Sequence, residues 1–228
     1  MLAPRQAYEL WSATYDAQPH NVILQREHQL FGELLSRVPL AGKTILDVGC
    51  GTGRHWERLL SQGPRALHGA DTSPEMLDRL RARFSGASLH LLQGPKLDEI
   101  ADASIDVLVS TLTIGHIEDI GEALAEWFRT MRPGGDMILT DFHPEAFRAG
   151  MKRTFVHGGE TIEIENHAHG VESLSAIFRA HDARVVRVEE KTIDESVRVQ
   201  FEREGYLAAY RRYRGTPLIL GLHVRKHG

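Results

Sequence analysis

The sequence contains very little cysteine and no long apolar run. Its single cysteine, Cys50, excludes an intrachain disulfide framework and a zinc site built from cysteines. No apolar run approaches the roughly 18 residues that a transmembrane helix needs. Residues 1–6 lack a basic region followed by an apolar core, so we expect no signal peptide. We therefore expect a cytoplasmic protein without a membrane partner.

Basic charge is also scarce. The 27 Lys and Arg residues are outnumbered by 31 Asp and Glu residues, which gives a formal net charge of −4. Proteins that coat nucleic acids are usually basic, so we expect no nucleic-acid partner. The 228 residues, 42% of them hydrophobic, are typical of a globular chain. Histidine is plentiful, and the 13 histidines suggest metal or acid–base chemistry.

Hydrophobic residues at helical spacing, among them Trp11 and Tyr15, predict two helices in the first 40 residues. From residue 44 the pattern changes to short apolar strands that alternate with helices. The strands are expected at 44–48, 66–70, 88–92, 105–110 and 136–142, and the helices between them at 53–61, from 73 onward and at 120–131. This alternation predicts an α/β fold with a doubly wound, parallel sheet.

After residue 143 the alternation ends. Two short strands, at 154–157 and 160–164, flank a Gly-Gly pair and predict a β-hairpin. The elements expected after it are a helix at 171–181, a strand at 183–192, a helix at 201–213 and a strand at 217–225. We interpret the hairpin as an inserted lid over the carboxyl ends of the strands, where open α/β sheets bind ligands.

A glycine-rich stretch follows Asp47 at the end of the first strand. Gly49, Gly51 and Gly53 let the backbone turn sharply and approach a ligand. A dinucleotide-binding fingerprint would need a further glycine where Arg54 stands. The Asp47 carboxylate would also repel a pyrophosphate, whereas it suits a ligand with a cationic group.

Asp71 stands at the end of the second strand, in the place where a carboxylate can accept hydrogen bonds from both hydroxyls of a ribose. Together with the glycine loop, Asp71 predicts a nucleoside ligand that has no phosphate to bind.

These residues, together with further segments, give the sequence its resemblance to a known family. It resembles the class I S-adenosylmethionine-dependent methyltransferases that act on small molecules (the type 11 group, which includes quinone-biosynthesis methyltransferases). The motifs occur in order as LDVGCGTG at 46–53, GADTSPEML at 69–77, ASIDVLVS at 103–110 and MRPGG at 131–135. Upstream, WSATYD at 11–16 resembles the N-terminal cap of the family.

The resemblance implies a single Rossmann-like methyltransferase domain over residues 1–228, with a mostly parallel sheet and an antiparallel last strand. Its parts would be an N-terminal helical cap (1–40), a cofactor-binding half (41–142), a lid insertion (143–180) and the C-terminal part of the sheet (181–228). The cofactor would be S-adenosyl-L-methionine, with S-adenosylhomocysteine as the product, and the partner a small-molecule acceptor.

The resemblance also implies roles for individual residues at the cofactor. Asp47, Gly49 and Gly51 would lie along its methionine part, and Asp71 would hold the ribose. The other residues expected there are Tyr15 over the methionine end, Thr72 and Met76 beside the adenine, and Ser110 near the sulfonium.

One position departs from the family pattern. Pro95 stands where the family often has an acidic residue that binds the adenine amino group. We therefore expect either the backbone of Lys96 and Leu97 or the side chain of Asp98 to read the adenine.

Four histidines near the predicted cleft are candidates for chemistry, because an acceptor that carries a proton needs a base. His116 follows the fourth strand and His143 the fifth; each is either a catalytic base or a residue that packs its own loop or turn. His167 and His169 are candidates for contact with the acceptor, as is Trp11. The alternatives for this histidine pair are a metal pair and a solvated loop, but no further ligand completes a set, so we expect no metal.

We therefore predict transfer of a methyl group to a small-molecule acceptor by in-line displacement. The alternatives are an NAD(P)-dependent oxidoreductase and a non-catalytic protein that binds S-adenosylmethionine.

Overall fold

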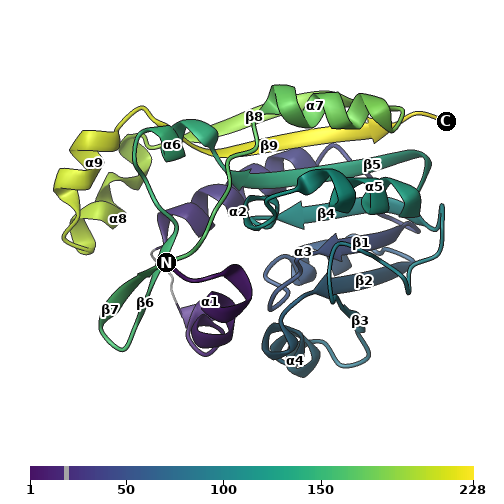
Figure 1. Cartoon of the computed structure of the whole chain (residues 1–228), viewed down its shortest axis with the longest axis horizontal. Coiled ribbons are helices and arrows are strands. Elements are labelled where there is room, and N and C mark those ends of the chain that lie inside the picture. Colours follow the sequence, from purple (N-terminus) through teal and green to yellow (C-terminus); the bar gives the residue numbers. More distant parts are fainter. Residues whose placement is uncertain (18–20) are drawn as a thin grey trace.

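Seven strands form one sheet in the order β3-β2-β1-β4-β5-β9-β8 in the computed structural model, which describes residues 1–17 and 21–228 (Figure 1). β9 runs antiparallel to both of its neighbours, and the remaining pairs are parallel. The mostly parallel sheet and its antiparallel last strand are therefore confirmed. The strand bounds are β1 Thr44–Val48, β2 Ala66–Asp71, β3 Ser88–Leu91, β4 Ile105–Thr111, β5 Met131–Phe142, β8 Ala183–Thr192 and β9 Pro217–Lys226.

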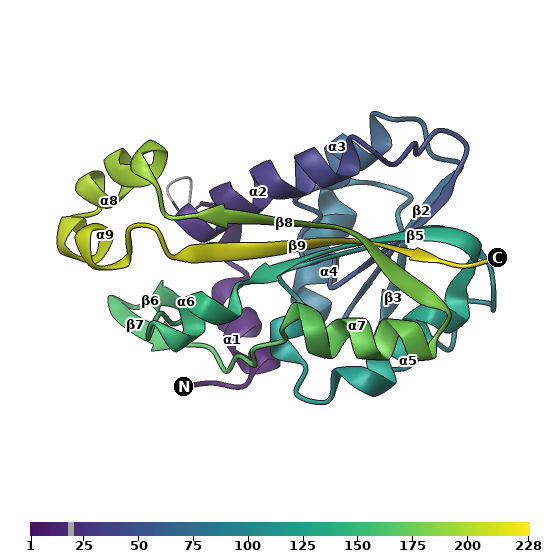
Figure 2. The ribbon, with the colours of Figure 1, turned by 90° about the horizontal axis from the view of Figure 1, so that it is seen from above.

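Helices cover both faces of the sheet (Figure 2). One core cluster contains residues of α2, α3 and α4, and a second cluster on the other face contains residues of α5 and α7. Within the described residues, no helix is both long and apolar enough to span a membrane. The helix bounds are α1 Pro4–Trp11, α2 Val22–Leu35, α3 Trp56–Leu60, α4 Pro74–Arg83, α5 Ile120–Thr130, α6 Pro144–Arg148, α7 Val171–Ala180, α8 Arg198–Arg203 and α9 Leu207–Tyr213.

The main differences from the expected elements are at β5 and at the helix expected over 201–213, and α3 begins at Trp56 rather than at residue 53. β5 begins at Met131 rather than at residue 136, because Met131 already pairs with Ile105 of β4. The single helix expected at 201–213 is divided into α8 and α9 around Gly205. The positive φ of Gly205 (+75°) is incompatible with a continuous right-handed helix.

The expected hairpin is present as β6 (Thr154–His157) and β7 (Glu160–Glu163). Both turn glycines have positive φ, as the two-residue turn that suits the twist of a hairpin requires. The hairpin packs on α1, where the rings of Phe155 and Trp11 stack at 5.0 Å, and Leu2 forms a parallel bridge with Ile164. We call residues 2–17 and 153–167 together the cap–hairpin unit.

A buried carboxylate joins α2 to the sheet. Glu27 is fully buried and lies 2.5 Å from the Arg54 guanidinium and 3.0 Å from His55 Nε2. Thr140 of β5 donates a hydrogen bond of 2.7 Å to the same carboxylate. Because Arg54 and His55 follow the glycine loop directly, this cluster fixes the loop against α2 and β5.

Burial lowers the pKa of His55 to about 4, although Glu27 works in the opposite direction. Unfolded His55 would titrate at about 6.5, so the unfolded chain binds the proton first as the pH falls. The stability that neutral His55 contributes is therefore present above pH 6.5 and is lost between pH 6.5 and 4. We expect the free energy of unfolding to fall by about 2 kcal/mol from this group between about pH 7.5 and about pH 5.

Urea unfolding of the protein and of His55→Gln at both pH values measures this contribution. The variant should lose less stability on acidification, whereas His157→Gln, which alters an exposed histidine of the hairpin, should behave like the unmodified protein. An equal loss in His55→Gln and the unmodified protein would contradict the assignment.

Candidate active site

A cavity of about 460 Å³ lies at the carboxyl ends of β1, β2 and β4. The glycine loop and the end of β2 form one wall, the segments after β3 and β4 and helix α5 form others, and the cap contributes residues from above. Its lining residues are Pro4, Tyr8, Tyr15, Val48, Gly49, Gly51, Asp71, Thr72, Met76, Leu92, Gly94, Pro95, Thr111, Leu112, Thr113, His116, Ile117, Glu118, Asp119, Glu122, Ala123 and Trp127.

The glycine loop needs its glycines for two different reasons. Gly49 has a φ of +73°, and a Cβ there would clash with the Thr113 side chain. Gly51 has a φ of +52°, but a Cβ built on it would meet no atom within 4 Å. Gly49 therefore allows the loop to pack on the segment after β4, whereas Gly51 leaves open space beside the cavity.

Asp71 connects the glycine loop to the start of α4. Its Oδ2 accepts a hydrogen bond of 2.8 Å from the Gly51 amide, and its Oδ1 accepts one of 2.9 Å from the Ser73 amide. Burial raises the pKa of this carboxyl, and the backbone amides oppose the shift. Because each carboxylate oxygen has two lone pairs, Asp71 can accept further hydrogen bonds from a ligand.

Asp47 lies behind the loop rather than in the cavity wall. Only 4% of the residue is exposed, and its Oδ2 accepts a hydrogen bond of 3.0 Å from Trp56 Nε1. Burial raises its pKa to about 7. This position suits a structural role of Asp47 at the base of the glycine loop.

Tyr8 of α1 and His116 meet at the cavity. The Tyr8 hydroxyl lies 3.0 Å from His116 Nε2, and His116 Nδ1 lies 3.2 Å from the Glu165 carbonyl oxygen. Because a carbonyl can only accept, Nδ1 carries the proton and Nε2 accepts from Tyr8. Burial and the charge of Arg153 hold the pKa of His116 well below its ordinary value, so the ring is neutral.

Arg153, from the segment before β6, lies directly behind this pair and is itself buried. Its Nη2 donates to the Tyr8 oxygen at 3.0 Å, and its Nη1 donates to the Leu112 carbonyl at 3.0 Å. The buried carboxylate of Asp141 lies 3.6 Å from the guanidinium. Leu112 has a positive φ (+55°), which a non-glycine residue rarely adopts. Arg153 therefore holds both the Tyr8 oxygen and a strained turn of the cavity wall.

Some of the residues expected at the sulfonium and the adenine lie outside the cavity lining. Ser110 does not line the cavity; it is buried, and its hydroxyl donates to the Val48 carbonyl at 2.8 Å. Thr111, Leu112 and Thr113 line the cavity in its place.

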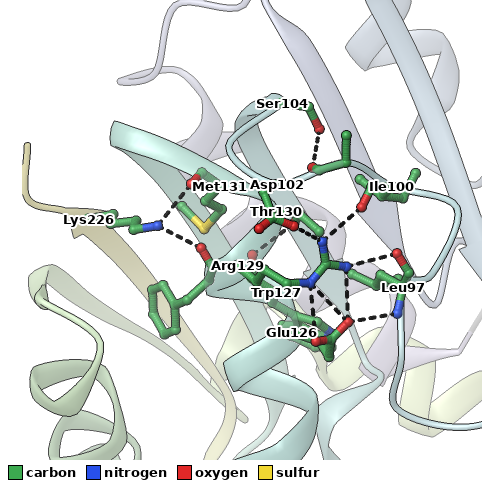
Figure 3. A network of polar contacts seen from close by, with 12 residues as sticks. Leu97, Ile100, Asp102, Ser104, Glu126, Trp127, Arg129, Thr130, Met131 and Lys226 are labelled. Atoms are coloured by element: carbon green, nitrogen blue, oxygen red, sulfur yellow. Dashed lines mark hydrogen bonds and ion pairs between the residues drawn. The ribbon is translucent and has the colours of Figure 1, made fainter.

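Lys96 and Leu97 do not line the cavity either. Both backbone groups of Leu97 have partners (Figure 3): its amide donates to Glu126 at 3.1 Å, and its carbonyl accepts from Arg129 at 2.9 Å. Leu97 thus has no free amide to read an adenine. Lys96 and Asp98 are exposed outside the cavity lining, which Leu92, Gly94 and Pro95 supply after β3.

His143 does not join His116 at the cavity. It is the N-cap of α6, where its Nδ1 accepts from the Glu145 amide at 3.0 Å, and its Nε2 donates to Glu190 at 3.1 Å. Both ring nitrogens therefore have partners away from the cavity lining. This geometry corresponds to the turn alternative for His143.

His167, His169 and Trp11 also lie outside the lining of this cavity. His169 Nε2 donates to the Ile117 carbonyl at 2.7 Å, and the His167 amide donates to the Gly115 carbonyl at 2.7 Å. Trp11 is buried between Tyr8 and Phe155 in the cap–hairpin unit. In the part of the chain that the structure describes, no group of three or more potential ligands is placed to hold a metal ion.

Comparison with known proteins identifies similar chains. Residues 46–139 match a family model described as a methyltransferase domain. A malonyl-[acyl-carrier protein] O-methyltransferase from Serratia marcescens is 29% identical over 180 residues, which cover 78% of this chain and 66% of that protein. An uncharacterized protein from Haemophilus influenzae is 34% identical over 119 residues, which cover 49% of this chain and 47% of that protein. The chain thus spans about half to two thirds of the length of these curated relatives.

The fold is similar to the crystal structure of an S-adenosylmethionine dependent methyltransferase from Mesorhizobium loti. The TM-score is 0.65 at 18% sequence identity, and the similarity covers 86% of this chain and 96% of that one. These similarities do not favour an oxidoreductase or a non-catalytic binding protein.

The buried ion pair between Arg153 and Asp141 should contribute to the free energy of unfolding. Arg153→Gln leaves Asp141 without its cation in a buried place, so we expect the free energy of unfolding to fall by about 3–5 kcal/mol. Arg148→Gln is the matched control, because Arg148 makes only an exposed ion pair within α6, and it should change stability by less than about 0.5 kcal/mol. Urea unfolding at neutral pH measures both values, and equal effects would contradict the role given to Arg153.

Proposed function

Because the chain belongs to the class I S-adenosylmethionine-dependent methyltransferases, we propose that it transfers the cofactor's methyl group to a small molecule in the cavity beneath α1. The composition of this cavity supports the proposal. The glycine loop and Asp71 form one wall, and the Tyr8–His116 pair forms another. A nucleoside site and a group that can take a proton therefore share one enclosed space.

The residues of the first wall fit the cofactor. Asp71 retains lone pairs for the two ribose hydroxyls after its bonds to the Gly51 and Ser73 amides. The open space beside Gly51 allows a ligand to approach the backbone closely. Leu92 and Pro95 offer an apolar surface to an adenine ring, with Met76 also in the lining.

When bound, the cofactor supplies a methyl group that its sulfonium already activates. The protein itself must orient an acceptor, exclude water and remove a proton where the acceptor carries one. Tyr8 and Pro4 place α1 over the cavity, and the contacts of α1 with the hairpin hold it there.

The Tyr8–His116 pair provides the route for that proton. Tyr8 lines the cavity, and its oxygen accepts a hydrogen bond from Arg153. Burial raises the pKa of the Tyr8 hydroxyl although the charge of Arg153 opposes this shift, so the tyrosine stays protonated and acts as a relay. Its own proton already points at the lone pair of neutral His116 Nε2. A proton from the acceptor can thus reach Tyr8 while the tyrosine proton moves to His116, and the Glu165 carbonyl holds the ring in place.

Cofactor binding tests the first wall. Asp71→Asn should weaken binding of S-adenosylhomocysteine by about 1.5–3 kcal/mol, because an amide cannot accept from both ribose hydroxyls. Asp78→Asn is the control, since Asp78 is exposed and pairs with Arg81 of the same helix. Isothermal titration calorimetry with S-adenosylhomocysteine and with NADH measures the affinities. Tight binding of NADH without any response to S-adenosylhomocysteine would refute the proposed function.

The rate of methyl transfer tests the role of the Tyr8–His116 pair. Tyr8→Phe and His116→Gln should lower kcat by roughly 10²–10⁴ for an acceptor that carries a proton, with little change in the affinity for S-adenosylhomocysteine. Tyr206→Phe, which alters a tyrosine that is 59% exposed, should leave both values unchanged. Transfer of labelled methyl groups from the cofactor gives the rate. Wild-type rates in both Tyr8→Phe and His116→Gln would exclude the proton route. The acceptor panel includes carboxylates, because the Serratia marcescens relative is named for a malonyl acceptor.

A further inference from the structure

The cavity has an unbalanced charge. Among the described residues, its lining includes the carboxylates of Asp71, Glu118, Asp119 and Glu122 but no Lys or Arg side chain. Two cations outside the lining contact lining residues, Arg153 at Tyr8 and Arg54 at Tyr15. Each has a buried carboxylate as its partner: Asp141 at 3.6 Å from Arg153 and Glu27 at 2.5 Å from Arg54. The sulfonium, ammonium and carboxylate of a bound cofactor sum to one positive charge, so they do not balance four carboxylates.

The acids on the α5 side are available to a ligand. Glu118 and Glu122 are exposed, and within the described part of the chain neither carboxylate has a hydrogen bond or an ion pair. Asp119 differs from them, because it caps α5 through a hydrogen bond of 3.1 Å from the Gly121 amide. A carboxylate acceptor would therefore meet like charges and no cation. In contrast, a positively charged group entering the cavity is attracted.

Two further features of the cavity also favour an acceptor with an amino group. Tyr8 and Tyr15 are among the lining residues, and aromatic faces attract ammonium groups. The hydrogen-bonded pair of Tyr8 and neutral His116 can take up a proton, which a carboxylate at neutral pH does not carry. A hydroxyl acceptor would use the proton route but gain nothing from the negative charge.

We infer that the acceptor is an amine, methylated at its nitrogen, and that the cavity discriminates against carboxylates. This inference rests on the proposed function and names its substrate class. The amine enters as an ammonium and first loses one proton. That proton passes to the Tyr8 oxygen as the tyrosine proton moves to His116 Nε2, and from there it is lost to water. The freed nitrogen lone pair then forms the new bond to the methyl carbon, while the methyl–sulfur bond breaks and its electron pair stays on sulfur. The methylated product leaves as an ammonium.

A matched set of acceptors tests the inference on the full chain. Benzylamine, benzyl alcohol and benzoate share a carbon skeleton and differ in the group that would be methylated. Transfer of labelled methyl groups should give at least about a tenfold higher kcat/KM for benzylamine than for either of the other two. A preference for benzoate or benzyl alcohol, or the absence of transfer to benzylamine, overturns the inference.

Binding gives a second readout that does not depend on turnover. The complex with S-adenosylhomocysteine, titrated by calorimetry, should bind benzylamine at least about tenfold more tightly than benzoate. The double variant Glu118→Gln/Glu122→Gln should narrow this ratio by roughly threefold to tenfold, because two unpaired charges are removed. Glu172→Gln, which alters an exposed acid at the start of α7, is the control and should leave the ratio unchanged. An unchanged ratio in the double variant would contradict the role of these charges.

Different measurements would overturn the proposed function and the choice of an amine acceptor. Loss of the proposed function would appear as the absence of S-adenosylhomocysteine binding. Loss of the inference alone would appear as intact S-adenosylhomocysteine binding together with tighter binding or faster methylation of benzoate.

Discussion

The buried guanidinium of Arg153 is the interaction on which the rest of the site depends. A buried cation must be neutralised and its N–H groups must find acceptors. Asp141 of β5 neutralises Arg153 from 3.6 Å. The hydrogen-bond acceptors are the Leu112 carbonyl after β4, Asn166 after the hairpin and Tyr8 of α1. Four distant segments must therefore assemble around one charge, and their assembly closes the cavity.

The same constraint arranges the groups to which the proposed function assigns the proton transfer. With Arg153 donating to its oxygen, Tyr8 directs its own proton to His116. The Glu165 carbonyl, from the segment after β7, fixes the other ring nitrogen. The cap–hairpin unit thus contributes functional groups as well as cover. The sheet supplies the opposite wall through Asp71 and the glycine loop, so the two halves of the site come from different structural layers.

The sheet and the place of Asp71 and the glycine loop at the cavity could be predicted because their signals are local. Each strand shows its own apolar run, and Asp71 stands in a motif directly after one. The contact of Arg153 with Tyr8 joins residues 145 positions apart, and no local pattern encodes it. For His143, the sequence predicted its place at the end of β5 but not the direction of its side chain, which caps α6. Position at a strand end therefore predicts proximity to the cavity, whereas the direction of the side chain depends on packing.

A crystal structure of the complex with S-adenosylhomocysteine and benzylamine would show both ligands in the cavity. We expect both ribose hydroxyls to bind Asp71 and the amine nitrogen to lie between the sulfur and the Tyr8 oxygen, within hydrogen-bond distance of the latter. A nucleoside bound away from Asp71, or a sulfur that faces away from Tyr8 and His116, would contradict this expectation.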